Sequence, residues 1–222
     1  MRIRTTLMVA LAALAASASW AQDHRAEIGV NAGWTFSDGV TGQAVLAGDG
    51  NFYNSVEPKD AFSWCLYLGF FVNEHVSVGA LFSQQKSQMV LGGATSREIA
   101  DWNVNNYHGI VTYHFGDSDA TARPYVFGGA GATQYSSFDF IGAAGEPRDI
   151  GGETQFSTTW GAGVKIYPSQ KVGLKLGARW TPTYIKSDAE GWWCDPYWGC
   201  YVVGDPQYSN QWEFTGGLSL RF

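Results

Sequence analysis

Residues 212–222 read WEFTGGLSLRF, and apolar and polar side chains alternate along most of this stretch. One face carries Trp212, Phe214, Leu218, Leu220 and Phe222, and the other carries Glu213, Thr215, Gly217, Ser219 and Arg221. Successive side chains of a β-strand point to opposite faces, so a period of two indicates a strand with one apolar and one polar face. This stretch therefore predicts a strand whose two faces meet different surroundings.

The same alternation recurs in seven further segments of the chain. They span residues 26–36, 62–72, 76–83, 106–115, 124–135, 156–166 and 172–180. Short connections at 73–74, 116–123 and 168–170 alternate with much longer ones at 37–59, 86–103, 136–154 and 186–209. Short turns at one end and long loops at the other are typical of membrane barrels, whose strands need roughly 9–11 residues. We therefore predict an all-β fold, an eight-stranded antiparallel up-and-down transmembrane β-barrel.

Aromatic residues mark the two boundaries of the apolar face. Near the end with the long loops are expected Trp34, Phe36, Phe62, Trp64, Phe82, Tyr107, Phe156, Trp160, Trp180, Trp212 and Phe214. Near the other end are expected Phe70, Tyr113, Phe115 and Phe222. Two such girdles flank the lipid-facing band of membrane barrels. The alternative is a soluble lipocalin-like barrel with an apolar interior, but aromatic and leucine side chains from eight strands would overfill so narrow a lumen.

The N-terminal residues predict export. Two arginines precede an apolar run, Leu7–Ala16, which is too short to span a bilayer as a helix, and Ser19-Trp20-Ala21 offers a cleavage site. We expect a signal peptide at 1–21 and a single barrel domain at 22–222, with a retained anchor as the alternative. The barrel domain then has 12 Lys and Arg against 20 Asp and Glu, a net charge of −8. This acidic balance argues against nucleic acid as a partner.

The chain resembles the small eight-stranded outer-membrane barrels of Gram-negative bacteria, the OmpA-like, opacity-protein and attachment-type group. The resemblance rests on the strand and loop pattern, on Arg123-Pro124-Tyr125-Val126 and on the ending Leu218-Ser219-Leu220-Arg221-Phe222. It implies a place in the bacterial outer membrane, among lipid and lipopolysaccharide, with both termini in the periplasm. It also implies that Leu218, Leu220 and Phe222 form a signal read by the barrel-assembly machinery. The group includes adhesins, immune-evasion factors and structural anchors, so it implies no single function.

Charged side chains are expected inside the barrel. Those with lumen parity are Glu27, Lys165, Lys175, Arg179, Glu213 and Arg221. Buried charges are costly unless they are paired, so we expect Glu27 and Glu213 to neutralise the cations. Closure of the barrel should bring Glu27 and Arg221 to the same level. Side chains fill the lumen of an eight-stranded barrel, which favours a charged plug, and the alternative is the selectivity element of a narrow channel for small solutes.

No set of residues predicts catalysis, a cofactor or a metal site. The lipid A deacylase group, whose members are barrels of this kind, uses a His-x-Ser pair on the outer face near the extracellular side. The only such spacing here, His75-Val76-Ser77, has lumen parity and lies beside a short turn, which is the wrong face and the wrong leaflet. A lipid A-modifying enzyme is therefore the least favoured function.

The last long loop concentrates aromatic residues where loops are normally polar. Trp192, Trp193, Tyr197 and Trp198 predict a recognition surface, or else a cluster that covers the barrel mouth or lies on the headgroups. Cys194 and Cys200 share this loop, whereas Cys65 has lumen parity, so an oxidising compartment predicts a Cys194–Cys200 disulfide. We therefore expect a structural or surface-interaction (adhesin-like) role, with an extracellular ligand or host surface as a candidate partner.

Overall fold

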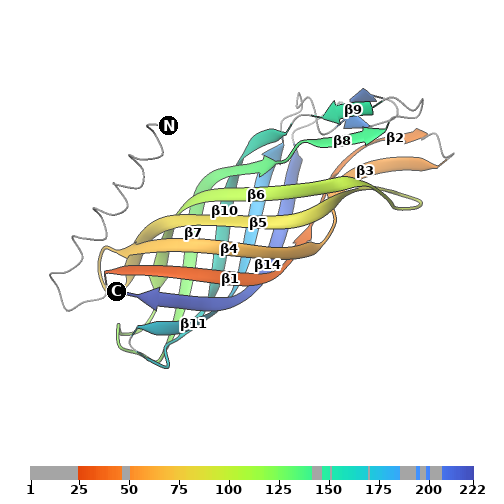
Figure 1. Ribbon diagram of the computed structural model, residues 1–222. Coiled ribbons are helices and arrows are strands. Elements are labelled where there is room, and N and C mark those ends of the chain that lie inside the picture. The colour runs from red at the N-terminus through yellow and green to blue at the C-terminus, as the bar shows by residue number, and fades with distance from the viewer. Residues whose placement is uncertain are drawn as a thin grey trace, which may run out of the picture.

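Eight long strands close into an antiparallel barrel in the computed structural model of the protein (Figure 1). The structure describes residues 25–46, 51–141, 147–150, 152–169, 171–185, 194–195, 199–200 and 207–222, so the expected signal peptide at 1–21 lies outside it. In barrel order the strands are β1 (Ala26–Ser37), β4 (Ala61–Phe71), β5 (Val76–Gly93), β6 (Arg97–His114), β7 (Ala122–Tyr135), β10 (Glu153–Ile166), β11 (Val172–Ile185) and β14 (Gln207–Arg221). Each strand pairs with the next, and β14 pairs with β1, so the predicted eight-stranded up-and-down barrel is confirmed.

The seam between β14 and β1 closes the wall in continuous register. The pairing runs from Glu27 opposite Arg221 to Ser37 opposite Gln211. Beyond it, the backbone N–H of Phe222 donates to the Ala26 carbonyl at 3.0 Å. Every barrel strand thus has two hydrogen-bonded neighbours, which is the condition for a β-structure to span lipid. No described segment is a helix long and apolar enough to cross a membrane.

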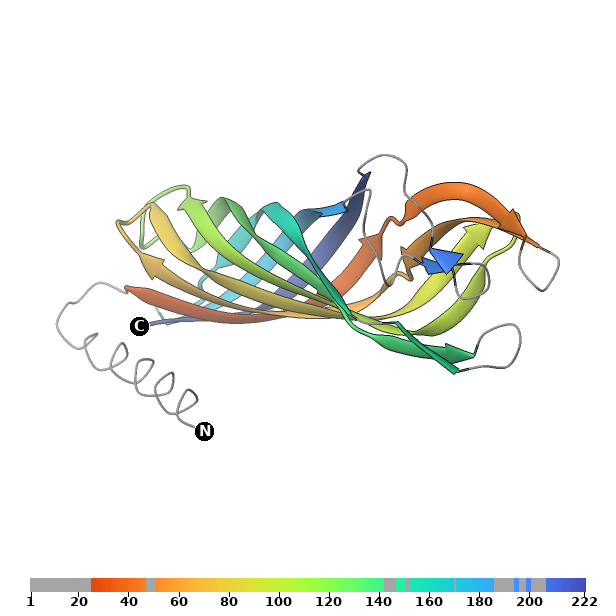
Figure 2. The same ribbon diagram turned by 90° about the horizontal axis from the view of Figure 1, so that it is seen from above.

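The two ends of the barrel differ in their connections. The turn end bears the short connections after β4, β6 and β10, and it holds both Arg25 and Phe222. The loop end bears the connections after β1, β5, β7 and β11. Figure 2 shows part of the wall projecting well beyond the other strands at the loop end, which lies away from the C-terminus.

The strands β5 and β6 continue far beyond their expected ends, which corrects the prediction of a long loop at 86–103. Their pairing continues from Lys86 opposite Asn103 to Leu91 opposite Arg97, so only residues 94–96 connect them. β3 (Phe52–Pro58) pairs with this part of β5, and β2 (Val40–Leu46) pairs with β3. We call β2, β3 and the parts of β5 and β6 at 86–93 and 97–103 the loop-end extension.

The other two long connections also contain paired strands. β8 (Phe138–Ile141) pairs with β9 (Pro147–Ile150), and β12 (Cys194–Asp195) pairs with β13 (Gly199–Cys200). The loops at 37–59, 136–154 and 186–209 are therefore hairpins in part, and the first of them extends the wall of the barrel.

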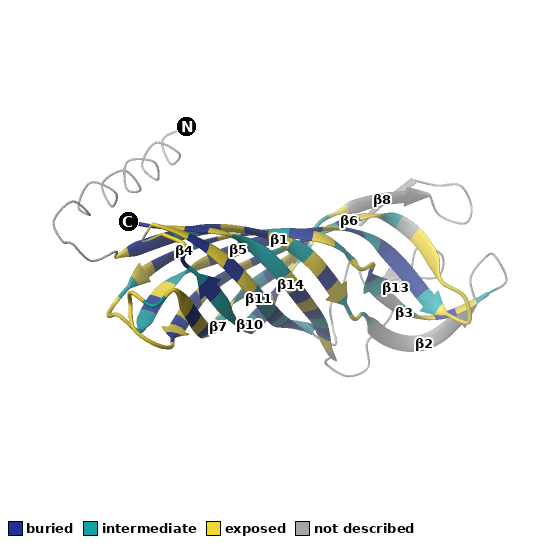
Figure 3. Cartoon of the chain, turned by 90° about the horizontal axis from the view of Figure 1, so that it is seen from below, coloured by how far each residue is buried: buried dark blue, intermediate teal, exposed yellow. Residues whose placement is uncertain are grey.

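Buried and exposed residues alternate along the barrel strands (Figure 3). The exposed outer face is apolar and the lumen is polar, as the alternation predicts. Val30, Leu176 and Leu218 are more than half exposed, whereas Asn31 and Ser219 are buried. This arrangement excludes the soluble lipocalin-like alternative, which would bury its apolar face.

Outward aromatic rings form a belt near the loop end. The belt runs from strand to strand because Trp160 lies opposite Trp180 and Trp180 lies opposite Trp212. The rings of Trp180 and Trp212 stack with their centroids 5.8 Å apart. Trp212 in turn lies opposite Phe36 on β1, so the belt crosses the seam. A belt of this kind is typical of the interface between headgroups and hydrocarbon.

Candidate functional site

The central feature of the lumen is an ion pair between Glu27 on β1 and Lys165 on β10. Lys165 Nζ lies 2.6 Å from Glu27 Oε2, and both side chains are 1 % exposed. Lys165 also donates to the hydroxyl of Tyr67 on β4 at 2.9 Å, and the hydroxyl of Tyr167 donates to Glu27 Oε1 at 3.3 Å. β4 and β10 lie diametrically opposite in the barrel, so this cluster reaches across the whole lumen.

A second ion pair lies further toward the loop end. Arg179 on β11 and Glu213 on β14 are register partners, and their side chains form a buried salt bridge. Arg179 also donates to Ser83 Oγ on β5 at 2.6 Å. Because β5 and β11 lie on opposite sides of the barrel, this contact again joins the two walls.

Lys175 and Arg221 have no carboxylate within salt-bridge distance among the described residues. Lys175 Nζ instead lies 3.8 Å from the centre of the Tyr67 ring and 5.1 Å from that of Tyr125. The Arg221 guanidinium lies 3.4 Å from the centre of the Tyr167 ring. Aromatic faces attract cations, so they replace the carboxylates that the sequence suggested as partners. Arg221 does lie at the level of Glu27, and the two side chains contact different parts of Tyr167, its ring and its hydroxyl, without a salt bridge to each other.

Polar side chains link the walls a third time near the loop end. Asn106 on β6 donates to Gln211 Oε1 on β14 at 3.0 Å, and these strands are also opposite each other. The Thr133 hydroxyl lies 2.6 Å from Asn106 Oδ1 and 2.9 Å from Ser157 Oγ. Sequence reasoning did not single out this network, because serine, threonine and asparagine are also common at unremarkable positions of a polar face.

Large rings fit the narrow lumen because glycines lie beside them. A Cβ atom on Gly161 would be only 2.4 Å from the Phe127 ring, and one on Gly29 would be 2.7 Å from the Tyr67 ring. These rings therefore lie flat against the neighbouring strand, in space that any other residue would fill. Phe127 and Tyr67 also pack with buried Cys65, whose Sγ accepts from Asn31 Nδ2 at 3.6 Å.

Two serine–histidine hydrogen bonds occur in the lumen, and neither forms a catalytic arrangement. Ser77 Oγ lies 3.1 Å from Nε2 of His114, not of His75, and Ser157 Oγ lies 2.9 Å from Nε2 of His108. The Nδ1 atoms of His108 and His114 have no hydrogen-bond partner among the described residues, so no acid orients either ring. All four groups are buried inside the wall, away from the lipid that a lipid A-modifying enzyme would attack.

The residues of the expected assembly signal share the outer face of the last strand. Leu218, Leu220 and Phe222 are each about half exposed there. β14 pairs with β1 and β11, so this strand completes the barrel. Their role as an assembly signal stays a prediction.

The predicted recognition surface lies outside the described residues, which do not include Trp192, Trp193, Tyr197 and Trp198. The backbones of Cys194 and Cys200 are described and pair directly opposite each other in β12 and β13. The disulfide between them stays a prediction.

The loop-end extension is a feature that sequence reasoning missed. Trp102 and Tyr135 are fully buried, with rings stacked 5.1 Å apart, and Met89 and Leu91 are each 1 % exposed. Its outer surface carries an ion pair between Lys59 and Glu98. The extension thus has an apolar core of its own. The alternation of residues 100–104, Ala-Asp-Trp-Asn-Val, was the signal that could have revealed it.

Comparison with known proteins agrees with this architecture. The family model of the outer membrane protein beta-barrel domain matches residues 5–222. Among solved structures, Neisserial surface protein A is 14 % identical, over 89 % of this chain and 97 % of its own, with a TM-score of 0.55. OprG from Pseudomonas aeruginosa is 13 % identical, over 90 % and 98 % of the two chains, with a TM-score of 0.55. The outer membrane protease OmpT from Escherichia coli is 10 % identical, over 90 % and 98 %, with a TM-score of 0.50. At these identities the likeness concerns the fold alone. No curated protein sequence matches the chain significantly.

Proposed function

This chain belongs to the outer-membrane β-barrel family, and on that premise we propose that it is a surface-interaction protein whose closed barrel anchors a rigid extension in the bacterial outer membrane. The proposal includes an orientation in which the turn end faces the periplasm and the loop end faces the exterior. Short turns lie on the periplasmic side of such barrels, which supports this orientation.

The observation that carries the proposal is the bridging of the lumen. Three contacts join opposite walls, those of Lys165 with Tyr67, Arg179 with Ser83, and Asn106 with Gln211. A conducting pore needs a continuous open path, and side chains that meet across the lumen leave less room for one. They therefore favour an anchoring barrel over the narrow channel for small solutes.

The loop-end extension supports an interaction role because its own core holds it in shape. Buried Trp102, Met89 and Leu91 pack inside it, and β3 widens it into an open sheet. A preorganised surface loses little conformational entropy on binding, so it can bind a partner more tightly than a flexible loop of equal length. Phe52, which is 57 % exposed on this extension, is a candidate contact residue. We further infer a non-enzymatic role, since the lumen histidines lack an orienting acid among the described residues.

Measurements of ion conductance across planar lipid bilayers test whether the lumen is closed. Purified protein should produce no discrete openings under conditions in which a porin control produces them. Reproducible unitary openings from the wild-type barrel would reject the anchoring role in favour of the channel.

Adhesion assays on intact cells test the interaction role. We would replace residues 86–103 by an Asn-Gly turn, which suits the hairpin left between Gln85 and Val104 because these two residues are register partners. Asp117→Asn at the turn end provides the matched control. Binding to epithelial cells or matrix proteins should fall in the shortened variant alone, with surface levels kept equal. Equal adhesion by all three strains would contradict the proposal.

A further inference from the structure

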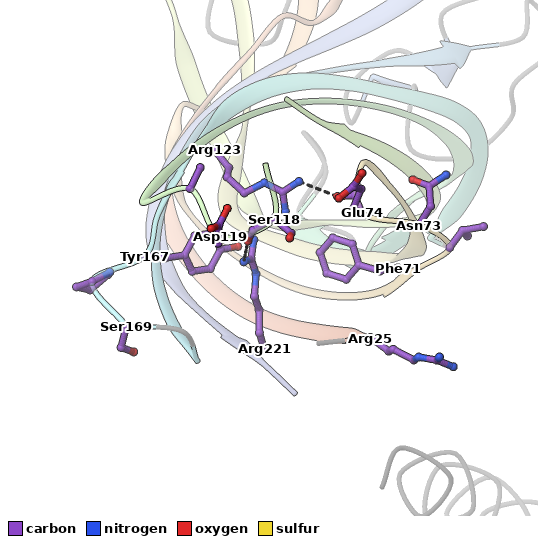
Figure 4. Close-up of a pocket in the computed structure, with 13 residues that line it drawn as sticks. Arg25, Phe71, Asn73, Glu74, Ser118, Asp119, Arg123, Tyr167, Ser169 and Arg221 are labelled. Atoms are coloured by element: carbon purple, nitrogen blue, oxygen red, sulfur yellow. Dashed lines mark hydrogen bonds between the residues drawn. The ribbon is translucent and has the colours of Figure 1, made fainter. Parts of the chain in front are cut away.

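A cavity of about 760 Å³ opens at the turn end of the barrel (Figure 4). Three arginines line it, namely Arg25, Arg123 and Arg221. Arg123 and Arg221 come from β7 and from the end of β14, and both donate to the connection between β6 and β7, to the carbonyls of Gly116 and Ser118. Two strands that are far apart in the barrel thus direct guanidinium groups to one place.

The Arg221 guanidinium is buried and held by its faces. It lies 3.4 Å from the centre of the Tyr167 ring and 5.8 Å from that of Phe71, and the residue is 6 % exposed. Among the described residues, its one hydrogen bond goes to Ser118 O and is long at 3.4 Å. Nε and Nη2 have no hydrogen-bond partner in the described part of the chain. The aromatic contacts therefore orient the group and leave one donor edge free.

Arg123 presents a second incompletely used guanidinium. The residue is 1 % exposed, and its Nη2 donates to Glu74 O at 2.7 Å. Its Nε has no hydrogen-bond partner among the residues that the structure describes. The two carboxylates that line the cavity, on Glu74 and Asp119, belong to exposed residues, and neither lies within 4 Å of an arginine nitrogen.

The charge of the barrel interior is unbalanced. Among the described residues, the buried charged side chains are the cations Arg123, Lys165, Lys175, Arg179 and Arg221 and the carboxylates Glu27 and Glu213. Both carboxylates are engaged, by Lys165 and Arg179, and Lys175 lies on tyrosine rings. Burying like charges without a counter-charge is costly. Two of the three cations without a carboxylate, Arg123 and Arg221, line the cavity.

We propose that this cavity binds a phosphate-class oxyanion through the Nε–Nη2 edge of Arg221 and the Nε of Arg123. Guanidinium groups bind phosphate oxygens by paired, charge-assisted hydrogen bonds, and Arg25 adds a third positive charge at the rim. The cavity is much larger than an inorganic phosphate, so it has room for an esterified organic group. The same chemistry could come from a soluble phosphate ester or from a phospholipid headgroup. The inference stands on this geometry and does not depend on the adhesion proposal.

The test follows the arginine Nε–Hε signals by nuclear magnetic resonance, on protein in neutral detergent micelles. Inorganic phosphate should shift the signals of Arg221 and Arg123 with one shared dissociation constant. Arg221→Gln and Arg123→Gln should each weaken binding about tenfold or more, the loss expected for a hydrogen bond to a charged group. Lys171→Gln removes a charge from the same end without touching the cavity, and it should leave the constant unchanged.

Two further titrations separate the sources. Glycerol 3-phosphate in solution represents the soluble ester, and phosphatidylglycerol doped into the micelles represents the headgroup. Saturable shifts at both arginines with either ligand support the site, and the ligand that causes them identifies the source of the bound phosphate group. The absence of shifts in the wild-type protein with all three ligands would overturn the proposal, as would wild-type affinity in both glutamine variants. The wild-type titration decides the matter even where a variant fails to fold.

Discussion

Glu27→Gln isolates the charge of the central ion pair, because glutamine keeps the shape of glutamate and still accepts a hydrogen bond. Lys165 would then remain 1 % exposed, with its Nζ bound only to neutral oxygens, and with Lys175 sharing the same Tyr67 ring. Breaking a buried pair by removing one partner typically costs about 3–5 kcal/mol. We expect a loss in this range in the free energy of unfolding.

The chain offers a matched control in the pair of Lys59 and Glu98. It joins the same two residue types, but its side chains are 48 % and 50 % exposed. Exposed pairs contribute about 0–1 kcal/mol, so Glu98→Gln should change stability little. Urea unfolding of both variants in lipid vesicles, followed by tryptophan fluorescence, measures the difference.

A double variant separates the charge effect from general damage. Glu27→Gln with Lys165→Met removes both charges, and it should recover most of the stability lost by Glu27→Gln alone, since no unpaired ion remains. Equal unfolding midpoints for Glu27→Gln and Glu98→Gln would refute the reasoning. So would a double variant that is destabilised by the sum of its two single changes.

Three further predictions concern assembly, packing and the loop end. Deletion of Phe222 should lower insertion into the outer membrane of cells and leave refolding into detergent nearly unchanged; normal cellular levels would contradict this. Gly161→Ala should cost about 1–3 kcal/mol of unfolding free energy by overpacking an aromatic ring, whereas Gly109→Ala, where an added Cβ meets nothing closer than 3.9 Å, should be tolerated in the same urea assay. Mass spectrometry of the unreduced, alkylated and proteolysed protein should show Cys194 linked to Cys200; alkylation of both thiols would disprove the bond, and its reduction should leave the unfolding midpoint of the barrel almost unaltered.

The long loop predicted at 86–103 shows why sequence pattern fails at the membrane boundary. Within lipid the apolar face points outward, as Val78 and Phe82 do on β5. In the extension the same strand reverses this preference, because Met89 and Leu91 point inward and Lys86 points into water. On β6 the alternation continues through Trp102 and Val104, but these apolar side chains are buried inside the extension, so a rule that requires outward apolar residues ends the strand too early.

The alternation by itself determined which side chains face the lumen, because a strand turns successive residues to opposite sides whatever surrounds it. Glu27, Lys165, Lys175, Arg179, Glu213 and Arg221 could thus be placed inside the barrel from the sequence alone. Only the tertiary structure decided their partners. Glu27 and Lys165 lie 138 positions apart, and they meet because closure and stagger of eight strands bring β1 and β10 to one level. The same closure leaves Lys175 and Arg221 against tyrosine rings, since distances across a lumen depend on the whole barrel and on no single strand.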